Sequence, residues 1–504
     1  LLDEFIFISI IINIVNKDMK LFKSIIHDDF FRLIIITSLV CGLEFCTASA
    51  FTFIPPMLLK AGIPESSMTW IMGCGPLLGF LLCPIIGDSS DHCRSPLGKR
   101  RPFILGFCLT IIFCLILIPQ SEAIGEIFQA PSIGIGLLVV TCILFDFAAQ
   151  ACFNPCESLI YDVCKGTSQE SSCFYVYSFM TSFGGCLGYL ITATDWTQTF
   201  LSNYIQGQEK STFIVILLFF SITLCCTLIS ANEKVSTMND YFDGQLRFDD
   251  IDNNCNYLFP IKILKNIFSS ISKSVRTIIT MPFVLRRLTL AECCSWSAIM
   301  TFNIFFTDFV GQTIYMGDPN ADEFSEERLR YDQGIRAGSY GLLFHCVVGA
   351  LYAPLLKPLI NRFGIHLTFS FGMFVFALSM LVMYVSRNII IVNIMASLSG
   401  LGMASLTSIP YTLVMVYHAN REIYFVDNHK IQTYGIGTIL GILDSTYFAS
   451  QILSSLIMGY IMLIFKSTLS YIVTSFVLAI CSICFINRIV INRHQLNGLI
   501  RNGK

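Results

Sequence analysis

Five acidic residues lie inside long apolar runs of the sequence, where a charge is costly: Glu44, Asp146, Glu292, Asp308 and Asp444. At mid-bilayer a carboxylate costs roughly 2.5–3.5 kcal/mol on insertion scales, so such residues are kept for function or for pairing. Apart from Arg32 at the start of the first run, no Lys or Arg falls inside them. Burial without a counter-charge favours the neutral carboxyl group and equips it to take up and release protons.

Asp146 and Glu44 are the first candidates for proton coupling. Gln150 follows Asp146 by one helical turn and shares its face of the helix. Glu44 lies in the middle of the first apolar run, and we expect it to face a central cavity as a proton or substrate contact. The alternative for Glu44 is a structural hydrogen-bonding role.

Two further groups of side chains are candidates for lining a substrate cavity. Asp444, Tyr447 and Gln451 recur at i, i+3 and i+7, so they form one polar stripe that lines a cavity or seals a helix–helix contact. Glu292 and Trp296 offer an acceptor and an aromatic face, as a sugar site would. The alternative for Trp296 is an anchor at the membrane interface.

Two other polar residues of the apolar runs are weaker candidates. Asp308 lies at the outer end of its run and, together with Asp318, is expected to order a loop rather than to couple protons. His345 is alone in its run and titrates near neutral pH, but a single histidine is more often a satisfied interior residue.

The composition predicts a membrane protein. The 504 residues are 54% hydrophobic and only 13% charged, whereas a soluble protein is about a quarter charged. The net charge of −2 disfavours a nucleic-acid binder. The 21 Cys residues are interpreted as small hydrophobic side chains. No phosphate-binding loop or catalytic constellation is present, so we expect no enzyme, cofactor or metal.

Twelve apolar runs are long enough to count as candidate spans. They cover residues 31–58, 68–87, 102–119, 132–153, 173–191, 211–229, 288–310, 338–356, 365–384, 389–417, 435–464 and 469–486. We therefore predict an all-α membrane protein of twelve transmembrane helices in two six-helix halves. The domains are a cytoplasmic N-terminal extension (1–30), an N-terminal half (31–229), a cytoplasmic central loop (230–287), a C-terminal half (288–486) and a cytoplasmic tail (487–504).

The basic residues predict the orientation of these spans. The side that holds both termini and the central loop collects 25 of the 32 Lys and Arg residues, and the richer side is cytoplasmic. Two six-helix halves with both ends inside are the layout of major-facilitator transporters, which bind substrate between the halves near the midplane of the bilayer.

The loop after the second span, Gly87–Pro102, has the composition of a cytoplasmic gate. An acidic side chain ends one helix and a basic triplet begins the next, so the two can pair when one side of a transporter closes. The residues of this gate motif are Gly87, Asp91, Arg94, Gly98, Lys99, Arg100 and Arg101. The alternative is that the basic residues only determine topology.

This loop resembles the elongated motif of plant sucrose–proton symporters and their animal relatives, the proton-associated sugar transporter and membrane-associated transporter protein family of the major facilitator superfamily. Ser90–Ser95 is similar to its Ser-Asp-x-Cys-x-Ser core and Gly98–Ile104 to its basic tail. Phe306–Gln312 and Tyr331–Gly334 also match the animal members. The resemblance runs from about Phe31 to Ile486 without the central loop.

The resemblance implies a proton carrier at Asp146, which falls on the leading Asp of the fourth-span motif. The sequence departs from the family at two nearby positions: Gln150 replaces an Asp, and Glu157 replaces an Arg implicated in sugar binding. The reversed charge at Glu157 leaves room for a cationic cargo. Lys99 replaces a usual Arg and preserves the charge.

These observations predict a proton-coupled symporter of a sugar, of the sucrose or hexose class, that works by alternating access. The first alternative is a proton-linked carrier of a polyamine, another amine or an amino-acid-like solute. The second is a channel-like or nontransporting protein of an organelle membrane. The expected partners are a small polar solute, protons and lipid, without nucleic acid, and the expected state is a monomer in the plasma membrane or an endomembrane.

Overall fold

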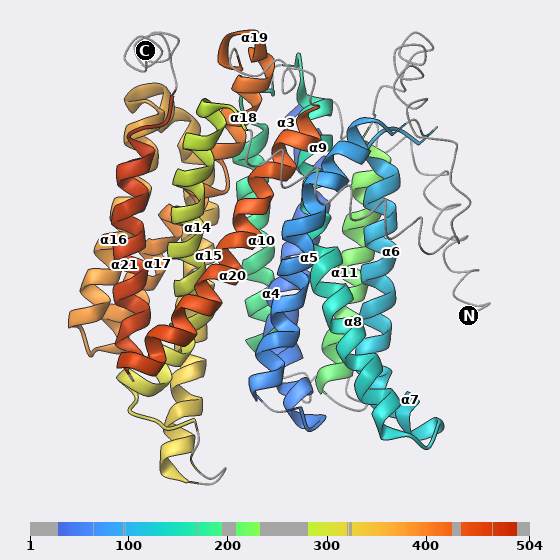
Figure 1. Ribbon diagram of the computed structural model, residues 1–504, viewed down its shortest axis with the longest axis vertical. Helices are drawn as coiled ribbons and strands as arrows, with labels where there is room; N and C mark the ends of the chain where they lie inside the picture. Colours follow the sequence, from blue (N-terminus) through green and yellow to red (C-terminus); the bar gives the residue numbers. More distant parts are fainter. Residues whose placement is uncertain are drawn as a thin grey trace, which may run out of the picture.

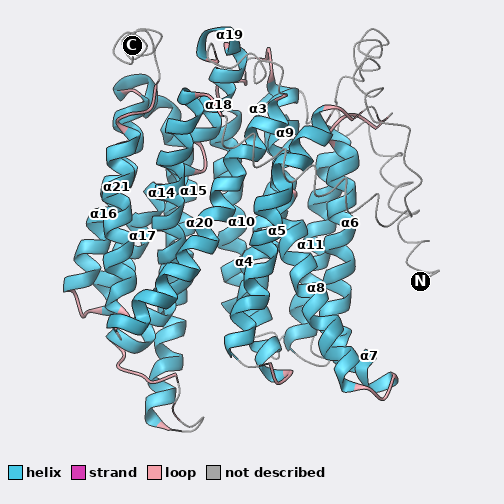
Figure 2. Cartoon of the chain, viewed as in Figure 1, coloured by secondary structure: helices cyan, strands magenta, loops and turns pink. Residues whose placement is uncertain are grey.

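The computed structural model describes residues 29–63, 65–93, 95, 97–167, 169–193, 208–231, 281–319, 321, 325–425, 435–465 and 467–490. Helices dominate these residues and none of them forms a strand (Figure 2). An apolar helix suits a bilayer because it satisfies its own backbone hydrogen bonds where no water is present.

The first group of helices packs around α4 and α8. Its elements are α3 (Asp29–Ile36), α4 (Ser38–Lys60), α5 (Glu65–Asp91), α6 (Arg101–Leu117), η1 (Ile118–Gln120), α7 (Ser121–Ile127), α8 (Pro131–Ala151), α9 (Phe153–Cys164), α10 (Cys173–Ala193) and α11 (Gln208–Ser230). The chain turns at Cys152 between α8 and α9, shortly before Pro155, whose ring cannot continue a regular helix.

The second group packs around α14 and α15. Its elements are α14 (Phe283–Phe309), the π-helical turn η4 (Val310–Ile314), α15 (Glu326–Phe363), α16 (Ile365–Val385), α17 (Ile389–Leu406), α18 (Ile409–Ala419), α19 (Arg421–Tyr424), α20 (Ile436–Phe465) and α21 (Leu469–Ile486). A turn at Thr407 and Ser408 separates α17 from α18. Pro410 stands in the first turn of α18, where a missing N–H is tolerated.

The two groups lie side by side with their helices running along the same direction (Figure 1). Their main contacts are α5 against α20 and α10 against α15, and α9 also touches α20. These contacts bring the second and eleventh spans together, and likewise the fifth and eighth. Side chains on α5, α9, α10, α15 and α20 therefore decide how the groups meet.

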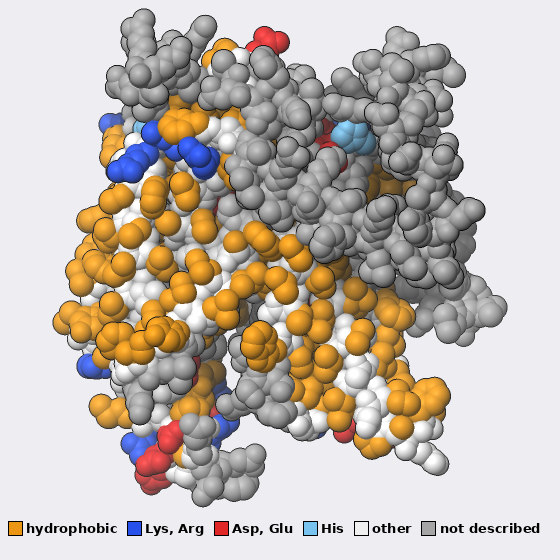
Figure 3. Space-filling model, in the orientation of Figure 1, with side chains coloured by type: hydrophobic (Ala, Val, Ile, Leu, Met, Phe, Trp, Pro, Cys, Tyr) orange, Lys and Arg blue, Asp and Glu red, His pale blue; other side chains and the backbone are white. Residues whose placement is uncertain are grey.

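Eleven helical stretches among the described residues are long and apolar enough to cross a bilayer, and α4 adds the shorter apolar stretch Ser38–Ala50. Hydrophobic side chains cover the middle of the face shown in Figure 3, and charged side chains gather at its ends. The all-helical membrane fold is confirmed, while the count of twelve spans stays a prediction.

Several boundaries differ from the sequence prediction. The eighth span was expected over 338–356, but α15 runs from Glu326 to Phe363. Ser325 caps its start by accepting a hydrogen bond from the Arg328 N–H at 3.2 Å, and Gly364 with φ +84° ends it. The seventh span begins at Phe283 rather than at Leu288. Most of the N-terminal extension, the central loop and the tail lie outside the described residues, so the proposed domain limits stay predictions.

Candidate functional site

The gate motif connects the end of α5 to the beginning of α20. The Asp91 carboxylate accepts hydrogen bonds from the backbone N–H groups of Gly437 at 3.0 Å and Thr438 at 2.8 Å. The Thr438 hydroxyl adds a third bond at 2.8 Å. A helix N-terminus carries unsatisfied N–H groups and a partial positive charge, so a carboxylate is well placed there.

Arg100 holds this carboxylate from the other side. Its guanidinium pairs with Asp91 at 2.6 Å and with Asp162 of α9 at 2.9 Å, and it also donates to the Ser90 hydroxyl. Burial by itself would lower the pKa of Arg100, but the two carboxylates raise it above the usual guanidinium value. The charge of Arg100 therefore does not change with physiological pH.

One glycine lets α5 and α20 approach at this point, and a second shapes the turn before α6. A side chain at Gly87 would meet the Gly437 carbonyl oxygen at 2.2 Å, so only glycine fits. Gly98 has φ +109° in the turn before α6, a conformation that other residues rarely adopt. Lys99 and Arg101 are partly buried in the same loop. Arg94 lies outside the described residues.

Asp146 is buried in α8 and faces α5. Gln150 donates a hydrogen bond to its Oδ1 at 2.5 Å, which confirms that the two share a helix face. The other oxygen, Oδ2, has no hydrogen-bond partner among the described residues. It lies so close to Gly75 that a Cβ there would stand 2.1 Å away.

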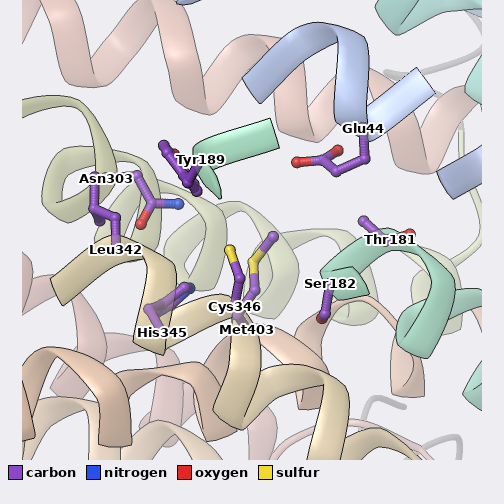
Figure 4. Close-up of a pocket in the computed structure, with 9 residues that line it drawn as sticks. All are labelled: Glu44, Thr181, Ser182, Tyr189, Asn303, Leu342, His345, Cys346 and Met403. Carbon is purple, nitrogen blue, oxygen red and sulfur yellow. The ribbon is translucent and has the colours of Figure 1, made fainter. Parts of the chain in front are cut away.

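Glu44 lines a cavity between the two groups (Figure 4). Its side chain packs against Gly184 of α10. The neighbouring Gly185 allows Cys346 of α15, in the opposite group, to approach closely. Glu44 thus lies at a cavity, and its role as a proton or substrate contact stays a prediction. The lining residues are Glu44, Thr181, Ser182, Tyr189, Asn303, Leu342, His345, Cys346 and Met403.

Two residues of this cavity, Asn303 and His345, were missed or underrated by the sequence analysis. The Nδ1 atom of His345 is 2.7 Å from the Ser399 hydroxyl. Its Nε2 and the Asn303 Oδ1 are buried without a hydrogen-bond partner among the described residues. The cavity volume is about 40 Å³, which is room for a few waters and not for a sugar.

A second polar cluster joins the groups at α9 and α20. Asp444 accepts hydrogen bonds from Asn154 at 2.8 Å and from Tyr411 at 3.2 Å, and the Cys83 thiol lies 3.8 Å away. Glu157 accepts one from Tyr177 at 2.6 Å. The Tyr177 and Tyr411 rings are in contact, with centroids 5.8 Å apart. At Asp444, the predicted polar stripe on α20 thus forms part of the contact between the two groups of helices.

Trp296 is buried, so its alternative role as an interfacial anchor is wrong. Its indole N–H donates to the fully buried Glu292 carboxyl at 3.3 Å. Tyr447 packs edge-on against Trp296 with centroids 4.9 Å apart. Gln451, one turn further along α20, is half-buried. These side chains form an aromatic wall with an acidic acceptor.

Neither the half-buried Glu44 nor the buried acids Asp146, Glu157, Glu292 and Asp444 take part in an ion pair observed among the described residues. Asp308 lies apart from them near the end of α14, where it accepts hydrogen bonds from Gln312 and Tyr331. This agrees with its predicted loop-ordering role.

Among the described residues, no group of three or more His, Cys, Asp or Glu side chains has the geometry of a metal site. The cysteines that the structure describes are free thiols.

Comparisons with known proteins agree with this fold. Residues 36–240 match the family model described as MFS/sugar transport protein. Human solute carrier family 45 member 3 is 34% identical over 395 residues, covering 78% of this chain and 71% of that protein. Human membrane-associated transporter protein is 29% identical, covering 78% and 79%. Proton-associated sugar transporter A of Rattus norvegicus is 20% identical, covering 85% and 82%.

Solved structures show the same fold at low identity. The human organic anion transporter MFSD10 superposes with a TM-score of 0.56 at 14% identity, covering 90% of this chain and 99% of its own. The major facilitator superfamily transporter FucP, in an outward conformation, gives 0.54 at 13% identity, covering 92% and 100%. Both likenesses concern the arrangement of helices alone.

Proposed function

Because this chain belongs to solute carrier family 45, a family of major-facilitator transporters, we propose that it carries a sugar of the sucrose or hexose class together with protons. The chain is a multi-pass membrane transporter and not an enzyme. The proposal rests most directly on Asp146, a buried acid of α8 that faces α5 and has one oxygen without a hydrogen-bond partner among the described residues.

Proton coupling requires an acid that changes charge during the cycle. A carboxyl group that is buried without a basic partner favours its protonated form, and contact with water lets it ionise. Asp146 and Glu44 both meet this description, and Glu44 also lines the cavity between the groups. One charge that crosses a potential of about 100 mV releases roughly 2.3 kcal/mol, which corresponds to about fifty-fold accumulation of cargo.

Sugar as the cargo is supported by two observations. Trp296, Tyr447 and Glu292 combine aromatic faces with a hydrogen-bond acceptor, and a related protein carries the name proton-associated sugar transporter. The present cavity is too small for a sugar. Binding therefore requires the two groups to separate, as alternating access demands.

The test is uptake by purified full-length protein in proteoliposomes. Labelled sucrose and glucose are offered with and without an inwardly directed pH gradient. We expect the gradient to drive accumulation, and a proton ionophore to abolish it. Equal accumulation with and without the pH gradient would refute proton coupling. Absence of sugar flux would refute sugar as the cargo.

An amine cargo is the second candidate, because acids and aromatic rings gather at the contact between the groups. Glu157 and Asp444 lie beside Tyr177 and Tyr411, and such surroundings attract organic cations. A labelled polyamine in the same assay separates the two cargoes. Currents far above carrier turnover, or no flux of any solute, would instead favour the channel-like or nontransporting alternative.

The remaining expectations belong to the same proposal. Both termini are cytoplasmic by the distribution of Lys and Arg, so the α5–α6 loop and its contact with α20 lie on the cytoplasmic side. The transporter works as a monomer in the plasma membrane or an endomembrane.

A further inference from the structure

Glu157 and Asp444 are carboxyl neighbours that come from opposite groups. Glu157 lies in α9 and Asp444 in α20. Asn154, one turn before Glu157, reaches across to Asp444 at 2.8 Å. Tyr177 and Tyr411, whose rings touch, bind one carboxyl each. Three side chains therefore fix the two acids near each other.

Hydrogen-bond donors are distributed unequally around the two acids. Asp444 is surrounded by donors, because Tyr411 donates to its Oδ1 and Asn154 to its Oδ2, where the Cys83 thiol also points. Glu157 accepts only from Tyr177 on Oε1, and its Oε2 has no partner among the described residues. An ionised carboxylate cannot donate, so two facing carboxylates cannot bond to each other, whereas a protonated acid donates to a carboxylate.

We propose that Glu157 and Asp444 form a proton site of their own, in which Glu157 holds one proton and shares it with Asp444 across the contact between α9 and α20. With the proton bound, the pair has one negative charge and one short O–H···O hydrogen bond. When the proton leaves to water, two carboxylates face each other without an intervening donor. Their repulsion then favours separation of α9 from α20.

Among the described residues that face the pair, none would neutralise the second charge. The titratable side chains that face it are Cys83 of α5, Tyr177 of α10, Glu292 of α14 and Tyr411 of α18. Each of these is neutral or negative. Arg100 approaches α20 at Gly437, two helical turns before Asp444, and it is already paired with Asp91 and Asp162.

The direction of the pH effect follows from this arrangement. The proton holds the groups together at α9 and α20, so acid pH favours the closed contact and alkaline pH opens it. This site differs from Asp146, which faces α5 within its own group. The inference depends on the transporter fold but not on the identity of the cargo, because both measurements below are made without cargo.

Infrared difference spectroscopy of the full chain in nanodiscs tests the protonation state. A protonated carboxylic acid has a C=O stretch that is resolved from that of a carboxylate. We expect Glu157→Gln to remove one protonated-acid band at acid pH, and expect the exposed control Glu126→Gln to remove none. If the protonated-acid bands of wild type and Glu157→Gln are the same, the proposal is overturned.

Hydrogen–deuterium exchange over residues 436–445 of α20 tests the contact itself. The quantity compared is the protection factor of wild-type protein divided by that of Glu157→Gln at the same pH. Above the pH at which the pair loses its proton, this ratio is expected to fall about tenfold per pH unit, because one proton is released. Glu157→Gln and Asp444→Asn each remove the repulsion, so both are expected to keep the contact closed at alkaline pH. An equal pH dependence in wild type and both variants would overturn the site. Failure of sugar uptake would leave this result unaffected.

Discussion

The Asp91 carboxylate lies 2.8 Å from the backbone nitrogen of Thr438, so the last residue of α5 holds the first turn of α20. The two helices belong to different groups, and Arg100 and Asp162 complete the same network. The Asp91 carboxylate thus connects the end of α5 to the N-terminus of α20 by hydrogen bonds.

Replacing this acid is expected to loosen the contact. Asp91→Asn keeps the shape but removes the charge, and hydrogen bonds to a charged group contribute about 1.5–3 kcal/mol. We expect the closed contact to weaken by about this amount, with faster hydrogen–deuterium exchange at the start of α20 and reduced uptake. The exposed Glu422→Gln is the matched control. Unchanged exchange in Asp91→Asn would show that the bonds do not hold the groups together.

Removing the charge of Asp146 is expected to separate coupling from transport. Asp146→Asn keeps a side chain that bonds to Gln150, but it no longer ionises. We expect pH-driven accumulation of cargo to be abolished while exchange of labelled for unlabelled cargo continues. Both are measured in the same proteoliposomes. Uphill uptake at the wild-type level would exclude Asp146 from proton coupling.

A methyl group at Gly75 is expected to reproduce the loss of coupling. Its Cβ would stand 2.1 Å from the Asp146 Oδ2, so the carboxyl must move, and overpacking of this kind costs typically 1–3 kcal/mol. Gly75→Ala should therefore lower pH-driven accumulation severalfold.

Gly73→Ala is the control for this effect, since a Cβ at Gly73 meets nothing within 4 Å on the same helix. Equal uptake by the two alanine variants would contradict the proposed contact between Gly75 and Asp146.

Loss of the indole N–H at position 296 is expected to destabilise the protein. Trp296→Phe keeps an aromatic ring against Tyr447, but it leaves the buried Glu292 Oε1 without the donor that now bonds to it. An unsatisfied buried acceptor costs about 1–3 kcal/mol, so the thermal unfolding midpoint in detergent should fall. Trp70→Phe, at a position 75% exposed, should leave the midpoint unchanged.

The spans and the gate pair could be predicted because their signals are local. Apolar runs long enough to cross a bilayer are read directly from the sequence, and Asp91 and Arg100 lie on either side of one loop. The same holds for Asp146 and Gln150, which are one helical turn apart and form the expected hydrogen bond.

Contacts between the groups could not be predicted, since they depend on how distant helices align. Nothing in the sequence pairs Asn154 with Asp444, or Tyr177 with Glu157. Asn154 lies within the fourth-span motif and near Glu157, so a search for amides close to buried acids would have found it. Glu157 was interpreted through its charge alone, whereas the structure surrounds it with a hydrogen-bond donor and a second acid.

The length of α15 has a consequence of its own. At 1.5 Å per residue, its 38 residues extend about 57 Å, nearly twice the hydrocarbon thickness of a bilayer. Its first turns therefore extend beyond the lipid. They are capped by Ser325 and packed against η4. A binding protein attached to this helical extension would move together with the second group of helices. It would provide a rigid reference feature for the alignment of single-particle images.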